Sequence, residues 1–268
     1  MHPVIHLFGR AFGTYGLCAF VGFALAIVLV WRLAKRCGNT IDEVLLLWIS
    51  IAAGLFLGGH LLYAITRADL VVKAFGDIGR EPFRVWYVEM ANAIGGMVFY
   101  GGFLGGLAGL LIFTRFYRSM KRENALDLYA VATPLFHTFG RIGCFFGGCC
   151  FGKESTWGFL VRENRYYPEM VGVVRLPVQL IEAGCNLLLF VFLFVLFLKR
   201  KAERELIWVY LTAYPVIRFT LEFWRGDSIR GVWFGLSTSQ WISIALFAAA
   251  LLHWALRFFK KPKQKAET

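Results

Sequence analysis

Long apolar stretches separated by short charged segments run along the whole chain. Four stretches contain no Asp, Glu, Lys or Arg: 11–31, 44–66, 90–114 and 231–256. Each is long enough to cross about 30 Å of hydrocarbon as an α-helix. Three more are apolar but carry ionisable residues, namely 125–147 with Arg141, 176–198 with Glu182, and 206–224 with Arg218 and Glu222. The pattern therefore predicts seven transmembrane helices.

Composition agrees with this interpretation. The 268 residues are 58% hydrophobic and 17% aromatic, which is typical of an all-α integral membrane protein. We find no internal repeat, low-complexity tract or linker, so we expect residues 1–268 to form a single transmembrane domain. The apolar run after Arg10 is as long as a full span, so we expect it to remain as the first helix rather than to be a cleaved signal.

The distribution of basic residues predicts the orientation. Lys and Arg are denser in one alternating set of connecting segments: 32–43, 115–124, 199–205 and 257–268. Because basic flanks stay in the cytoplasm, we expect the N-terminus outside and the C-terminus inside. The net charge of +12 follows mainly from this topology. A nucleic-acid partner is not expected, because the basic residues do not gather on one soluble face.

Two long segments fall on the outer side. Residues 67–89 and 153–175 both mix aromatic and charged side chains. This mixture suits an interfacial segment that lies along the headgroup layer. We expect the two segments to frame an entrance from the outer leaflet.

Ionisable residues within the spans are the first candidates for function, because a charge at membrane depth costs several kcal/mol unless it is paired or hydrated. Arg218, Glu222 and Arg225 share one helical face, and Arg141 lies in another span. One interpretation is an internal ion pair. The other is a phosphate site, since one glutamate leaves the arginines in excess and guanidinium binds phosphate through paired hydrogen bonds. A phospholipid headgroup is then the candidate substrate.

The chain contains six cysteines, three of them close together at 144, 149 and 150. Their spacing lacks the paired Cys-x-x-Cys arms of a structural zinc site, and His137 is the only nearby histidine. We therefore expect no metal. A disulfide to a distant partner is a further alternative, and small apolar filling is the favoured role.

Several motifs resemble one known family. The run Gly140-Arg141-Ile142-Gly143-Cys144-Phe145, with Gly152 after it, is similar to the signature of the prolipoprotein diacylglyceryl transferases, which is usually Gly-Arg-x-Gly-Asn-Phe, then Asn-Gly-Glu and a later Gly. Other matching blocks follow in family order: Tyr15-Gly16, Gly95-Gly96-Met97 with Gly101-Gly102, Pro177-Val178-Gln179 with Glu182, Tyr214, Arg218, Glu222, Phe223, Arg225 and Gln240.

The resemblance implies a seven-helix enzyme of the bacterial cytoplasmic (inner) membrane that needs no metal or soluble cofactor. Such an enzyme moves the diacylglyceryl group of phosphatidylglycerol to the lipobox cysteine of a preprolipoprotein and releases glycerol phosphate. By similarity, Arg141 and Arg218 hold the phosphate and stabilise the leaving group. The implied catalytic residues also include Tyr15, Tyr100 and Glu222. The implied lipid-binding residues are Arg141, Cys144, Gly101, Gly102, Gly152, Tyr214, Arg225, Gln179, Glu182 and Gln240.

The chain departs from the family pattern near the chemistry. Tyr100 stands where the family ordinarily has histidine, and a phenol with a pKa of about 10 is a poor base at neutral pH. Cys144, Gly147 and Cys149 replace asparagine, asparagine and glutamate. His60 is an alternative base, although a helix–helix hydrogen bond is its more usual role.

Two alternatives to the orthodox reaction stay open. One is a paralogue with another lipid donor or acceptor. The other is a non-catalytic membrane protein that binds or transports phospholipid or another anion.

Overall fold

The computed structural model describes residues 3–7, 9–162, 164, 168–226 and 232–259. Within these residues the chain forms helices and three short two-stranded antiparallel sheets. The helices are α1 (Thr14–Arg36), α2 (Ile41–Thr66), α3 (Ala68–Gly76), α4 (Phe83–Ile94), α5 (Phe99–Phe116), α6 (Arg122–Gly147), α7 (Val178–Leu198), α8 (Leu206–Glu222) and α9 (Thr238–Phe259). The strands are β1 (Val4–Leu7) with β2 (Arg10–Gly13), β3 (Glu154–Leu160) with β4 (Val174–Arg175), and β5 (Val232–Trp233) with β6 (Leu236–Ser237).

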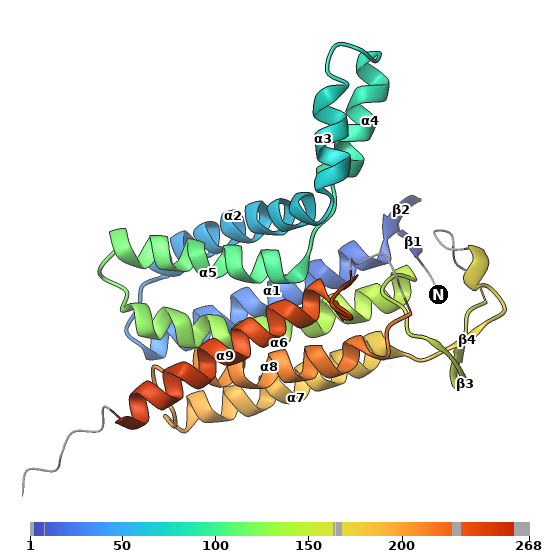
Figure 1. Ribbon diagram of the computed structural model, residues 1–268. Helices are drawn as coiled ribbons and strands as arrows, with labels where there is room; N and C mark the ends of the chain where they lie inside the picture. Colours follow the sequence, from blue (N-terminus) through green and yellow to red (C-terminus); the bar gives the residue numbers. More distant parts are fainter. Residues whose placement is uncertain (1–2, 8, 163, 165–167, 227–231, 260–268) are drawn as a thin grey trace, which may run out of the picture.

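The long helices run alongside one another in an elongated bundle (Figure 1). A long helix occupies each of the seven apolar stretches of the sequence. Five of them, α1, α2, α5, α7 and α9, are long and apolar enough to cross a membrane. Apolar side chains also cover much of the outer surface of the bundle, as lipid contact requires. The protein is therefore a multi-pass helical membrane protein.

Two predicted boundaries were wrong. The stretch 90–114 does not form one helix, because the chain leaves helical geometry after α4 and resumes it at Phe99, where α5 begins. Gly95 and Gly96 lie in this break, where Tyr63 packs against Gly96 too closely for a side chain there. The stretch 231–256 begins with the β5–β6 turn, and α9 starts at Thr238.

The two long connecting segments take different forms. Residues 67–89 are largely helical: α3 and α4 form a hairpin that projects from one end of the bundle, across the direction of the long helices (Figure 1). The Trp86 indole donates to the carbonyl of Ala74 and fastens the two helices together. Residues 153–175 hold the β3–β4 hairpin, which lies at the same end of the bundle.

Glycines bring α2 and α5 into backbone contact. A Cβ atom at Gly105 would lie 2.1 Å from the carbonyl oxygen of Gly54, and one at Gly101 would lie 2.3 Å from that of Gly58. A Cβ at Gly109 would lie 2.2 Å from the carbonyl oxygen of Ser50. Small residues at this spacing let membrane helices approach closely. The pair α2–α5, joined by the α3–α4 hairpin, is thus a tightly packed unit.

This packing predicts a position-specific response to alanine. Gly105→Ala should destabilise the protein by about 1–3 kcal/mol, because the added methyl group forces the two backbones apart. The control is Gly184→Ala on α7, where no heavy atom lies within 4 Å of the added carbon. It should leave stability unchanged or raise it, since alanine is the better helix former. Thermal unfolding in detergent measures both, and equal midpoints would contradict the close α2–α5 contact.

Candidate active site

A buried ion pair joins α6 to α7. The Nε atom of Arg141 lies 2.9 Å from Oε2 of Glu182. Arg141 is only 6% exposed and Glu182 is fully buried. One turn before Arg141, the Nε2 atom of His137 lies 3.7 Å from the other oxygen of the same carboxylate. A charge pair without water stays in place only when each partner satisfies the other, so these contacts fix the position of the guanidinium.

A second group of charges lies at the end of α8. Arg218, 2% exposed, pairs through Nη2 with Glu222, four residues later on the same helical face. The same Nη2 atom donates a hydrogen bond of 3.3 Å to the Ser239 hydroxyl on α9. Arg225, just beyond the helix, places its Nε atom 3.8 Å from the Glu222 carboxylate. The sequence spacing predicted this shared face correctly.

The two groups share one electrostatic environment. The positive charges of Arg141, Arg218 and Arg225 all act on the Glu182 carboxylate. Three buried arginines of the site, Arg141, Arg218 and Arg225, face the buried Glu182 and the partly buried Glu222. Glu182 therefore pairs with a cation that the sequence interpretation had counted as excess. Arg218 Nη1 is buried and meets no hydrogen-bond partner among the described residues. This arrangement suits an anionic ligand.

Aromatic side chains form one wall of the site. The Phe99 ring stacks on His137 with centroids 3.7 Å apart, and Tyr214 meets both rings edge-on. Tyr100 also packs against Tyr214, and its hydroxyl lies 2.6 Å from that of Ser243 on α9. Tyr100 is thus placed among the expected site residues in a hydrogen-bonding position.

The loop after α6 is tied to the start of α7 and the end of α8. Gln179 donates a hydrogen bond of 2.9 Å to the carbonyl of Cys149. Gly152 forms a backbone bridge with Arg225, and a Cβ at Gly152 would lie 2.4 Å from the carbonyl of Leu176. Only glycine allows this approach. The signature segment thereby holds Arg225 beside the other arginines.

Three thiols gather at the end of α6. The Sγ atoms of Cys144, Cys149 and Cys150 all lie within 4.8 Å of one another. Tyr15 packs against the last turns of α6, since a Cβ atom at Gly147 would lie 3.6 Å from the Cβ atom of Tyr15. The pKa of Cys150 lies well below its ordinary value, because hydrogen bonds from Cys144 and Cys149, and then the charges of Arg225 and Arg141, stabilise the thiolate. Sequence spacing did not predict this convergence, which depends on a tight turn after α6.

Other expected site residues have structural contacts. Gly101 packs on Gly58, and Gly102 faces Leu55, so both lie at the α2–α5 contact. Gln240 forms a capping box at the start of α9, accepting from the Ser237 backbone at 2.9 Å and donating its own backbone N–H to the Ser237 hydroxyl. A lipid contact for these three residues stays a prediction.

His60 has the helix–helix role considered for it. Its Nδ1 atom lies 2.8 Å from the carbonyl oxygen of Ile94, across the α2–α4 contact.

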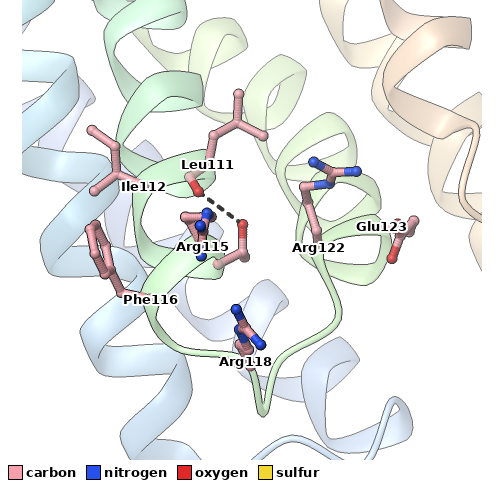
Figure 2. Close-up of a pocket in the computed structure, with 8 residues that line it drawn as sticks. Leu111, Ile112, Arg115, Phe116, Arg118, Arg122 and Glu123 are labelled. Atoms are coloured by element: carbon pink, nitrogen blue, oxygen red, sulfur yellow. Dashed lines mark hydrogen bonds between the residues drawn. The ribbon is translucent and has the colours of Figure 1, made fainter.

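A separate cavity opens between α5 and α6, near the loop that joins them. Its volume is about 680 Å³, and Arg115, Arg118 and Arg122 line it together with apolar side chains of α5 (Figure 2). These arginines lie at the other end of α6 from Arg141. The cavity is therefore distinct from the arginine–glutamate site.

Together these features define a class: a multi-pass membrane protein with a polar, arginine-rich site enclosed by apolar helices. Comparison with known proteins gives the family. Residues 3–256 match the model of the family described as prolipoprotein diacylglyceryl transferase, and the chain belongs to that family. It is therefore a transferase.

Similar proteins carry the same description. The chain is 30% identical over 269 residues to a phosphatidylglycerol–prolipoprotein diacylglyceryl transferase of Clostridium tetani, covering 97% of this chain and 100% of the relative. It is 30% identical over 267 residues to such an enzyme, numbered 2, of Clostridium perfringens, covering 97% of each. It is also 30% identical over 264 residues to one of Campylobacter jejuni, covering 95% of this chain and 93% of the relative. The similarity thus extends over at least 95% of the chain in each case.

Removing one member of a buried pair should destabilise the protein. Glu182→Ala leaves Arg141 without its counter-charge, and we expect a loss of about 3 kcal/mol. Glu203→Ala is the control, because Glu203 pairs with Arg200 at the surface, with 3.8 Å between Nε and Oε1. That change should cost less than about 1 kcal/mol. Thermal unfolding in detergent compares the two, and similar midpoints would argue against a buried pair at Glu182.

Proposed function

We propose that this protein transfers the diacylglyceryl group of phosphatidylglycerol to the lipobox cysteine thiol of a preprolipoprotein and releases glycerol phosphate. Family membership supports the reaction. The observation that carries the proposal within this chain is the buried Nη1 atom of Arg218, which has no hydrogen-bond partner among the described residues and lies in a site with the buried Arg141 and Arg225. A lipid phosphate supplies an acceptor for that donor.

Arg141 and Arg218 bind and stabilise the phosphate in this proposal. Guanidinium keeps its charge in an apolar site and presents several N–H donors in one plane. The leaving glycerol phosphate gains negative charge as its bond to the glyceryl carbon breaks. Fixed cations in a site without water stabilise that charge strongly, because they need no reorganisation during the reaction. Arg218 Nη1, without a partner among the described residues, is the donor best placed to take a phosphate oxygen.

The remaining site residues have positioning roles. Glu182 and Glu222 hold the arginines in place before lipid binds. Gln179 and Gly152 fix the loop after α6, and Tyr214 borders the site with its hydroxyl buried. Tyr15 lies on α1 against the end of α6 and is half exposed, so that it can contact the acceptor. Tyr100 supplies a hydrogen bond rather than a base in this proposal.

Seven membrane spans, formed by α1, α2 and α5 to α9, complete the proposal. Arg141 and Arg218 are the charged residues within the apolar sequences of α6 and α8, and both have partners inside the bundle. These partners lower the free-energy cost of placing the charges in the membrane. The strand hairpins β1–β2 and β3–β4 and the α3–α4 hairpin lie at one end, which we assign to the outside of the bacterial cytoplasmic membrane (Figure 1). The basic connections lie at the other. The α3–α4 hairpin then lies along the outer headgroup layer.

Reporter fusions test this topology. A periplasm-active phosphatase fused after Ser155 or Val72 should be active, whereas one fused after Arg118 or Lys201 should be inactive, since the latter two positions lie in basic, cytoplasmic connections. A cytoplasm-active fluorescent reporter should give the reverse pattern. Any other alternation would reject seven spans with the N-terminus outside.

Substitution of the arginines tests the reaction. Arg141→Gln and Arg218→Gln should each lower turnover by about 100-fold or more, because each removes a cation from the transition state. The assay uses purified protein, labelled phosphatidylglycerol and a lipobox peptide, with mass spectrometry of the peptide and detection of glycerol phosphate. Arg115→Gln, in the separate cavity, is the matched control and should retain activity.

Full activity in either site variant would contradict the phosphate role. An unmodified peptide with wild-type protein, while a reference enzyme is active, would instead favour a paralogue with another donor or acceptor, or a protein that only binds or transports lipid. The departures at Tyr100, Cys144, Gly147 and Cys149 are the reason to test these alternatives.

A further inference from the structure

The proposed reaction leaves one step without an assigned group: activation of the acceptor thiol. A thiolate is the reactive form of cysteine, and a free thiol with a pKa of about 8.5 is mostly protonated at neutral pH. The Tyr100 hydroxyl is hydrogen-bonded to the Ser243 hydroxyl. The imidazole of His60 is hydrogen-bonded to the carbonyl of Ile94. His137 is enclosed by Phe99, Tyr214 and Glu182. None of these contacts involves residues 144–150, where the chain departs from its family.

That segment carries three converging thiols instead. Cys144 lies on the last turn of α6, three residues after Arg141. Gly148, with φ of 75°, ends the helix and reverses the chain, and Cys150 follows with φ of 57°. A left-handed conformation costs about 1 kcal/mol for a residue other than glycine, and such strain persists where the surroundings impose it. The turn brings Cys149 and Cys150 back against Cys144, and the Gln179 hydrogen bond holds it there.

The distances suit a common metal ligand. Two thiolates bound to one tetrahedral Zn²⁺ stand about 3.8 Å apart, given Zn–S bonds of about 2.3 Å. The three Sγ atoms lie within 4.8 Å, so side-chain rotations of about 1 Å bring them into range. No histidine or carboxylate joins this group among the described residues. Three protein ligands with a fourth position for substrate is the pattern of a catalytic zinc site, whereas a structural site has four.

We propose that Cys144, Cys149 and Cys150 bind one Zn²⁺ ion and that the thiol of the acceptor cysteine becomes its fourth ligand. The inference rests on the proposed function and names the group that activates its nucleophile. Zinc deprotonates a coordinating thiol outright, so no separate base is needed. The charges also agree: three thiolates and Zn²⁺ carry a net negative charge, and Arg141 and Arg225 act on the same thiols.

The acceptor thiol binds Zn²⁺ and releases its proton to water. Its sulfur then attacks the glyceryl carbon that bears the phosphate ester and forms the carbon–sulfur bond. The carbon–oxygen bond breaks, and its electron pair leaves on glycerol phosphate, whose charge Arg141 and Arg218 stabilise. The thioether product is a weaker zinc ligand than the thiolate, and it dissociates.

Metal content is the first measurement, because it does not depend on activity. Wild-type protein purified under reducing conditions with Zn²⁺ in the growth medium should contain about one zinc per chain by mass spectrometry. The variant C144S/C149S/C150S should contain none. The matched control is C18S/C37S/C185S, which removes the other three cysteines, all of them free thiols in the structure, and should keep the metal. Cys149→Ser is a milder variant that should lower zinc occupancy if the triple variant does not fold.

Cobalt substitution tests the fourth ligand. Co²⁺ bound to wild-type protein should give a thiolate charge-transfer band, and a lipobox peptide should strengthen that band, whereas the same peptide with serine for cysteine should not. Removal of zinc by a chelator should abolish transfer, and added Zn²⁺ should restore it. A band that does not respond to the cysteine peptide would overturn the role proposed for the metal.

The outcomes separate this inference from the proposed function. Active wild-type protein without metal would overturn the zinc site and leave the transferase proposal standing. A disulfide between two of the three cysteines in active protein, seen by mass spectrometry without reduction, would also overturn it. Wild-type protein that binds zinc but transfers nothing to the peptide would keep the metal site and reject the proposed reaction. Copper in place of zinc at the same cysteines would reject the choice of metal.

Discussion

The arrangement of α6, α7 and α8 depends on keeping arginine side chains inside an apolar bundle. An isolated guanidinium there would cost several kcal/mol, and the cost falls only when a carboxylate and further polar groups surround it. Arg141 has Glu182 on the next helix, and Arg218 has Glu222 one turn later on its own helix. The first pair fixes how α6 faces α7, and the second presents cations from α8 to the same space.

Two kinds of packing hold the rest of the bundle. Around the site, aromatic rings and tyrosine hydroxyls fill the space between α5, α6, α8 and α9. Between α2 and α5, glycines remove side chains altogether and allow backbone contact. The two kinds of packing have different effects. Bulky rings exclude water and so strengthen the electrostatic interactions of the arginines. Glycines allow a close helix–helix contact, which an added side chain easily disrupts.

Much of this architecture is encoded in local patterns. Uninterrupted apolar runs predicted where the long helices lie, and the i, i+4 spacing of Arg218 and Glu222 predicted their shared face. Local patterns could not predict the partner of Arg141, because Glu182 lies on another helix and their contact depends on tertiary packing. The break at Gly95–Gly96 was missed because an apolar composition does not distinguish one helix from two. The three thiols converge through a left-handed turn that ligand-spacing rules do not include.

The close glycine contacts also make α2 and α5 one unit, which the α3–α4 hairpin continues, while α6 to α8 and the residues just after them carry the arginines of the site. The hydrogen bond between Tyr100 and Ser243 crosses from α5 in this unit to α9. A lipid diffuses sideways within the leaflet and has no need to leave it. Separation of these two parts beside Tyr100 would admit such a molecule from the flank and leave the Arg141–Glu182 and Arg218–Glu222 pairs intact, because both pairs lie within α6 to α8.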